Sequence, residues 1–142
     1  LNEAKTKMKA ARPDRANAFG WESDMKYYAA TKDSKGYLAA ARSYQKSEVK
    51  NNAAKLQDLT VNLLRAFPDD AKALEQAEKW AKTSAESGGL PEYYLTLADI
   101  YKRQGDKTKA RATAEKARKA IGDPDTKNMG RKVDYFIEGL SE

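Results

Sequence analysis

The sequence predicts an all-α fold built from antiparallel helical hairpins. The clearest hairpin lies in residues 91–117, where Gly105-Asp106 separates a helix with large side chains from a helix with small ones. On one face of the first helix, helical spacing brings together Tyr94, Leu97, Ala98 and Tyr101. On one face of the second helix, the same spacing brings together Ala110, Ala114 and Ala117. A bulky face that meets a small-residue face allows two antiparallel helices to approach closely.

The first 50 residues are predicted to form a short helix and then a hairpin. A helix over residues 1–11 ends before Pro13, because proline disfavours helical backbone in the residue before it. The hairpin has helices over about 13–31 and 35–49, and Ser34 is the expected N-cap of the second. Its two apolar faces consist of Trp21, Met25 and Tyr28, and of Tyr37, Leu38, Ala41 and Tyr44.

A second hairpin is predicted over residues 53–88. Pro68 ends its first helix, and Asp69 or Asp70 serves as the N-cap of its second. Gly88-Gly89 supplies a left-handed C-cap, and Pro91 opens the third hairpin. The two apolar faces consist of Leu56, Leu59, Leu63, Leu64 and Phe67, and of Leu74, Ala77, Trp80, Ala81 and Ser84.

The third hairpin is predicted to end shortly after Ala120. Gly122 is the expected C-cap, and Pro124 lies beyond it. A closing helix over about 125–140 follows, and its apolar stripe consists of Val133, Phe136, Ile137 and Leu140. Its other side is polar, as suits a helix that covers the end of a stack of hairpins.

The residue order of the third hairpin resembles the tetratricopeptide repeat, a helix-turn-helix unit of 34 residues. The equivalent aromatic-face positions are Trp21, Leu56 and Tyr94, which are 35 and 38 residues apart, and Lys32 stands where the last unit has Gly105. The resemblance covers about residues 14–121 and is specific over 91–121. It implies one domain, residues 1–142, whose hairpins stack as a right-handed α-α solenoid with a C-terminal capping helix. The implied units are about 13–50, 53–88 and 91–121, with the cap at about 125–140.

The resemblance also implies a ligand surface on a concave face, formed by the first helix of each unit. Transferred position by position, the binding residues are Gln57, Val61, Leu64, Glu92, Leu95, Asp99 and Lys102, with Glu22, Lys26 and Ala29 in the first unit. The carboxylate-clamp form of the family has asparagine-like positions where Asp99 and Val61 stand here, so a clamp for a chain-terminal carboxylate is not expected. The apolar members indicate a groove for a peptide or helix, although packing on a neighbouring helix explains them equally well.

No catalytic or metal site is predicted. The chain has no cysteine and no histidine, which excludes a thiolate nucleophile, a disulfide and a His- or Cys-ligated metal. The pair Asp69-Asp70 is better explained as a helix cap than as paired acids. Gly88-Gly89 lacks the Lys-Ser/Thr of a phosphate loop. We therefore expect a non-catalytic protein with no cofactor and no small-molecule substrate, whose partner is a protein or peptide of undetermined identity.

The chain is basic, with a net charge of +6 from 27 basic and 21 acidic residues. Residues 1–50 hold 11 basic and 6 acidic residues, a net charge of +5. Such a surface attracts nucleic acid, anionic lipid or an acidic partner. No nucleic-acid recognition motif accompanies the charge, so a solvated lysine-rich surface is the favoured interpretation and nucleic-acid binding a minor alternative.

A further alternative is that the chain is an accessory region of a larger enzyme. The runs Leu63–Asp70, Leu74–Ala81 and Tyr94–Asp106 resemble the C-terminal repeat region of certain bacterial thioredoxin-fold proteins of the cell envelope. The redox Cys-x-x-Cys would then precede Leu1, and the chain would be periplasmic or cell-envelope rather than cytoplasmic. Because the sequence does not begin with Met, we expect a processed or trimmed chain. No signal peptide is visible in it. No apolar run approaches the ~18 residues that a membrane-spanning helix needs.

The aromatic residues are predicted to be mainly structural, since aromatics at helical spacing usually belong to a core. The predicted core aromatics are Trp21, Tyr28, Trp80, Tyr94 and Tyr101. The sequence leaves open the oligomeric state and the exposure of Tyr27, Tyr37, Tyr44, Tyr93 and Tyr135.

Overall fold

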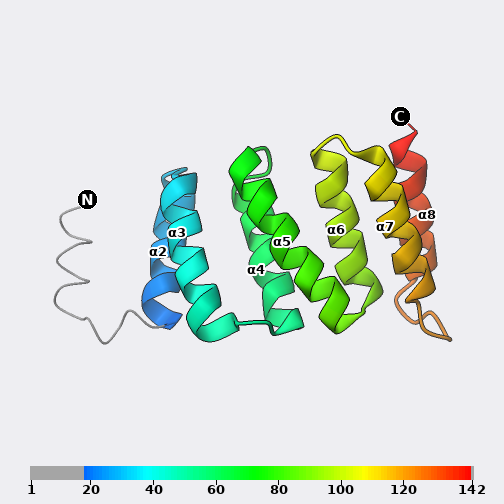
Figure 1. Cartoon of the computed structure of the whole chain (residues 1–142), viewed down its shortest axis with the longest axis horizontal. Coiled ribbons are helices and arrows are strands. Elements are labelled where there is room, and N and C mark those ends of the chain that lie inside the picture. The colour runs from blue at the N-terminus through cyan, green and yellow to red at the C-terminus, as the bar shows by residue number, and fades with distance from the viewer. Residues whose placement is uncertain (1–17, 142) are drawn as a thin grey trace. The chain divides into compact units, whose positions relative to one another are not determined.

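A computed structural model describes residues 18–141, and this part of the chain contains helices and turns without a strand (Figure 1). The all-α prediction is therefore confirmed for these residues. The helices are α2 (Ala18–Ala30), α3 (Ser34–Tyr44), η2 (Gln45–Val49), α4 (Ala53–Ala66), α5 (Ala71–Gly88), α6 (Pro91–Arg103), α7 (Lys107–Lys119) and α8 (Met129–Leu140). The helix predicted over residues 1–11 and the start of the next, 13–17, lie outside the described residues. The chain divides into two compact units, up to Lys50 and from Asn51 onward.

The first unit is the hairpin of α2 and α3, extended by the π-helical turn η2. Its buried residues include Met25, Tyr37, Leu38, Ala40, Ala41 and Val49. Lys32 occupies the left-handed region with φ of 58°, as Gly105 does with φ of 84° in the last hairpin. Both positions therefore have left-handed backbone, although one of them is not glycine. Asp33 caps α3 by accepting a hydrogen bond from Gly36 N at 3.0 Å, so the prediction of Ser34 as the cap was wrong by one residue.

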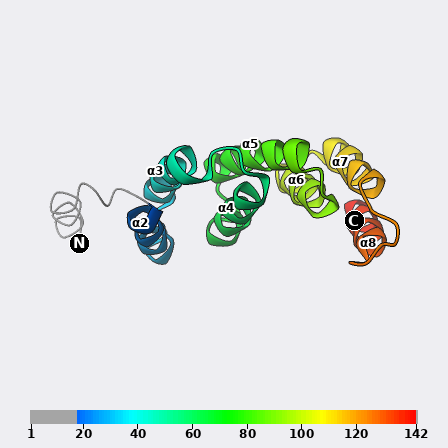
Figure 2. The same cartoon turned by 90° about the horizontal axis from the view of Figure 1, so that it is seen from below.

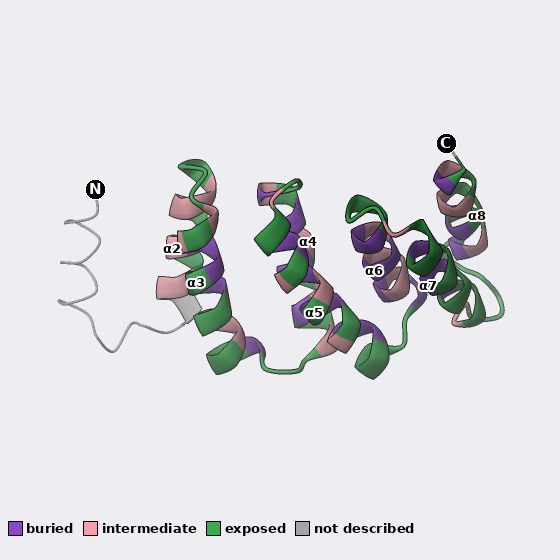
Figure 3. Cartoon of the chain, turned by 45° about the horizontal axis from the view of Figure 1, so that its top comes forward, coloured by how far each residue is buried: buried purple, intermediate pink, exposed green. Residues whose placement is uncertain are grey.

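The second unit consists of α4 to α8, in which each helix packs on the next and α8 also contacts α6. Seen from below, α4, α6 and α8 form one layer, and α5 and α7 form the other (Figure 2). The predicted stripe of α4 and the alanine face of α7 are buried, whereas Tyr94 of α6 and Phe136 and Ile137 of α8 are half-buried (Figure 3). The buried Ser84 hydroxyl donates a hydrogen bond to Ala53 O at 2.8 Å. This two-layer packing leaves the outer faces of α4 and α6 on the same side of the unit.

Short polar side chains and glycine set the helix ends of this unit. Asn52, Asp70 and Asp106 are N-caps, and each accepts a hydrogen bond from the backbone N–H three residues on, at 2.9–3.0 Å. Gly89 is a left-handed C-cap of α5 with φ of 69°. The predicted cap at Asp70 and the predicted stop at Gly88-Gly89 are thus confirmed.

The segment between α7 and α8 differs from the prediction. The C-cap of α7 is Ala120 in right-handed geometry, not Gly122. The last helix begins at Met129 instead of Asp125 or Thr126. Asn128 has φ of 53°, which interrupts helical backbone before Met129. Asp125 stays outside the helix and caps it, since its carboxylate accepts hydrogen bonds from Met129 N and Gly130 N, both at 2.8 Å.

This cap makes the stability of α8 depend on pH. The hydrogen bonds from Gly130 and Met129 hold the pKa of Asp125 below its ordinary value of 3.8, and they outweigh the opposing effect of burial. Because the pKa of Asp125 is lower in the folded state than in the unfolded state, its carboxylate stabilises the fold at any pH above the unfolded pKa. This stability is lost as the pH falls from about 3.8 through the folded pKa. We expect Asp125→Asn to reduce the loss of unfolding free energy between pH 7 and acid, measured by denaturant titration. Asp123→Asn, a neighbouring exposed carboxylate, is the control and should keep the wild-type slope. An unchanged slope in Asp125→Asn would contradict the assigned cap.

The aromatic residues fall into three groups. Trp80, Tyr101, Tyr37 and Tyr93 are buried, and only the first two were predicted to be in the core. Trp21, Tyr28 and Tyr94, also predicted as core, are half-buried, as are Tyr27 and Tyr44. Tyr135 is 80% exposed. The half-buried rings still pack: Tyr94 lies against the core of α6, α7 and α8, and the rings of Tyr27 and Tyr28 meet edge to face at 5.4 Å.

Candidate functional site

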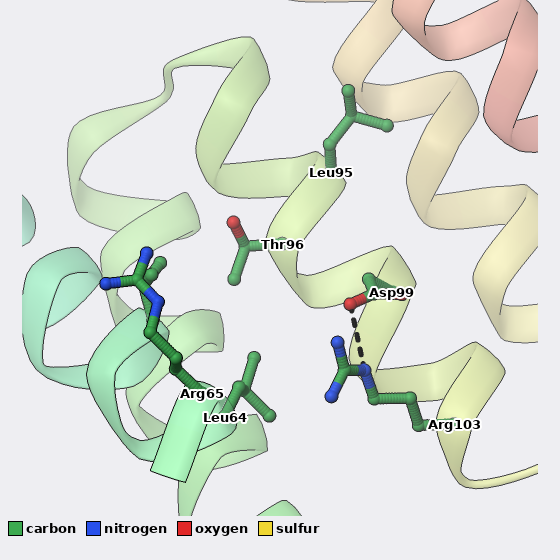
Figure 4. A pocket seen from close by; sticks show the side chains of 7 residues that line it. Leu64, Arg65, Leu95, Thr96, Asp99 and Arg103 are labelled. Atoms are coloured by element: carbon green, nitrogen blue, oxygen red, sulfur yellow. Dashed lines mark hydrogen bonds and ion pairs between the residues drawn. The ribbon is translucent and has the colours of Figure 1, made fainter. Parts of the chain in front are cut away.

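An open groove lies between α4 and α6 in the second unit (Figure 4). It has a volume of about 430 Å³. The residues that line it are Val61, Leu64 and Arg65 of α4, and Leu95, Thr96, Asp99 and Arg103 of α6. Four of them were predicted as binding residues from the sequence, namely Val61, Leu64, Leu95 and Asp99. The groove is thus built from the first helices of two successive hairpins.

The two walls are held by α5 and by a hydrogen bond at one end. Helix α5 packs on both α4 and α6, so it fixes their separation. Gln57 Nε2 of α4 donates to Thr96 Oγ1 of α6 at 2.7 Å, and Thr96 Oγ1 donates in turn to Glu92 O at 3.0 Å. The other side-chain atom of Gln57, Oε1, is buried and has no hydrogen-bond partner among the described residues. Gln57 therefore ties the two helices together at the edge of the groove instead of lining it.

Aliphatic side chains form the apolar part of the groove. Leu64 is 6% exposed, whereas Val61 and Leu95 are half-buried. Leu95 also packs against the core cluster of Ala98, Ala114, Ala117 and Val133. Leu64 and Leu95 therefore contribute to the packing of the unit, while Val61 and Leu95 also leave apolar surface exposed in the groove.

Three charged residues line the groove. Arg103 Nε donates to Asp99 Oδ2 at 3.0 Å, four residues back on the same helix. Arg65 is exposed and has no ion-pair partner among the residues that the structure describes. Two guanidinium groups against one carboxylate leave the groove with a net positive charge.

The other predicted binding residues do not line the groove. Glu92 pairs with Lys127 Nζ at 3.5 Å, and Lys102 Nζ lies 5.8 Å from the ring centroid of Phe136 on α8. Both contacts lie on the α8 side of α6, away from the groove. In the first unit, Glu22 Oε1 accepts a hydrogen bond from the Tyr44 hydroxyl at 3.1 Å, while Lys26 is exposed and Ala29 half-buried.

Three lining residues were missed by the sequence analysis, namely Arg65, Thr96 and Arg103. Each follows a predicted residue directly in the chain. The signal was available in the helical spacing, because Arg65 is four residues after Val61 and Arg103 is four residues after Asp99. Because the groove is bounded by two helices, residues next to the predicted positions also line it.

The groove combines apolar and polar side chains. It presents aliphatic surface, a hydroxyl, a carboxylate and two guanidinium groups. Among residues 18–141 no cluster of acidic side chains could hold a metal ion, and no helix there is both long and apolar enough to cross a membrane. Comparison with family models, with curated proteins and with solved structures gives no match to this chain.

Proposed function

We propose that this chain is a non-catalytic protein-interaction scaffold of tetratricopeptide-repeat type, which binds a peptide or protein segment in the groove between α4 and α6. One observation carries the proposal. The groove brings together Val61, Leu64, Leu95 and Asp99, which come from two helices and were predicted as ligand positions from the repeat register. An aliphatic surface with a few polar groups is what an extended or helical segment requires.

The order of packing supports the same proposal. Residues 53–88 and 91–119 form two successive hairpins, and their helices pack consecutively with α8 covering the last. Such hairpins bury their apolar faces against their neighbours and leave one series of helices available to a ligand. The groove lies on that series of helices, as a repeat scaffold requires.

Selection from a random peptide display library on the immobilised chain tests the proposal. We expect enriched peptides that bind the wild type and bind Val61→Glu at least about tenfold more weakly, because the longer charged side chain fills an apolar wall. Ala112→Glu introduces the same charge at an exposed position of α7 and is the matched control. Circular dichroism confirms that both variants are folded.

Two results would contradict the proposal. One is the absence of any enriched peptide. The other is a set of enriched peptides whose affinity is the same for Val61→Glu and for the wild type, since these would bind outside the groove.

A further inference from the structure

The charges of the groove are divided between its two walls. Arg65 comes from α4 and Arg103 from α6, and in Figure 4 the Leu64 side chain lies between the two arginines. An apolar surface therefore has a guanidinium group on each side of it. This pattern of cation, aliphatic surface and cation restricts the chemistry of what can bind.

The hydrogen-bonding capacity of these arginines is largely unused. A guanidinium group has five N–H donors. Asp99 accepts a hydrogen bond from Nε of Arg103, and in Figure 4 the two terminal nitrogens of Arg103 face toward Leu64. The same ion pair fixes the direction of the Arg103 side chain, so these nitrogens are presented to the groove. The Arg65 side chain makes no hydrogen bond or ion pair with the described residues.

We propose that the segment bound in this groove is acidic, with carboxylate side chains on both sides of an aliphatic one. This inference rests on the proposed function. The aliphatic side chain contacts the accessible surface of Val61 and Leu95, and the carboxylates accept hydrogen bonds from Arg65 and from the terminal nitrogens of Arg103. Guanidinium groups suit carboxylates because their paired N–H donors match the two oxygens.

The source of the carboxylates is the interior of a polypeptide, not its C-terminus. A chain end supplies one main-chain carboxylate, whereas the groove offers guanidinium groups on two separate walls. Asp or Glu side chains of an internal segment supply two carboxylates at a fixed spacing. The partner is therefore a protein with an exposed stretch in which acidic and aliphatic residues alternate.

The experiment uses a peptide enriched in the display selection and synthesised with both ends blocked by acetyl and amide groups. We expect the enriched sequences to share Asp or Glu on each side of a Leu, Ile or Val. We expect Arg65→Gln and Arg103→Gln each to weaken binding of the blocked peptide roughly three- to tenfold in fluorescence anisotropy. Binding should also weaken with added salt. Arg111→Gln on α7, an exposed arginine outside the groove, should leave the affinity unchanged.

The outcomes separate this inference from the proposed function. Peptides that lose affinity in Val61→Glu but carry no shared acidic residues would overturn the inference alone. So would a peptide that binds only with a free C-terminal carboxylate. The same holds if both arginine variants bind the blocked peptide as the wild type does. An absence of peptides that depend on the groove would overturn the proposed function and this inference together.

Discussion

Replacing Ala98 with tryptophan is expected to destabilise the second unit by about 3 kcal/mol, which lowers its melting temperature by about 10–20 °C. Ala98 has no exposed surface and lies in the cluster with Ala114, Ala117 and Val133, where α6, α7 and α8 meet. An indole ring at this position has no space unless the three helices move apart. Thermal unfolding followed by circular dichroism gives the shift.

The control for this prediction is Ala112→Trp. Ala112 is on α7, the helix that packs on α6, but its side chain is exposed, so an indole there meets solvent. Its melting temperature should stay within a few degrees of the wild type. Equal effects of the two substitutions would mean that the packing of α6 against α7 is not as described.

Truncating Trp80 to alanine is expected to have a comparable or larger effect, a loss of about 3–5 kcal/mol in unfolding free energy. Trp80 is 5% exposed and lies on the buried face of α5 with Ala77, Ala81 and Ser84. Alanine at this position leaves a cavity that the helices of the unit cannot close without moving. Because α5 packs on both walls of the groove, peptide binding should weaken together with stability.

Tyr135→Ala is the matched control, since it truncates an aromatic ring in the same unit that is 80% exposed. Denaturant unfolding should give nearly the wild-type free energy for this variant. If Trp80→Ala were as stable as Tyr135→Ala, the side chain at position 80 would not belong to the core.

Helical spacing predicted the fold class and most of the buried residues. The stripe of α4 and the alanines of α7 could be assigned because apolar residues recur there with few interruptions. The helix caps were harder to predict, because residues that favour the N-cap position are adjacent in the sequence. Asp33 and Ser34 are both good N-caps, and only the backbone geometry decides between them. The start of α8 was predicted too early because Asp125 lies outside the helix and caps it with its side chain. The left-handed backbone of Asn128, which ends the preceding loop, could not be predicted from the residue pattern.

The sequence predicted those groove residues that share one face of a helix. Val61, Leu64, Leu95 and Asp99 share the face that α4 and α6 direct to the same side of the unit. The engagement of Glu92 by Lys127 and the stacking of Lys102 over Phe136 depend on where α8 and its preceding loop return. The position of α8 against α6 depends on contacts between residues far apart in the chain. It therefore could not be predicted from the repeat pattern of α6 alone. The ionic pattern of Arg65 and Arg103 becomes visible only when the two walls are placed side by side.

We propose that the groove between α4 and α6 binds a peptide, and an amide chemical-shift map tests this claim most directly. The ¹⁵N-labelled chain is titrated with a blocked peptide from the display selection. We predict that the largest shifts fall in residues 57–65 and 92–103, on the two walls of the groove. Shifts confined to α5, α7 or the first unit, with the amides of both walls unmoved, would contradict the claim.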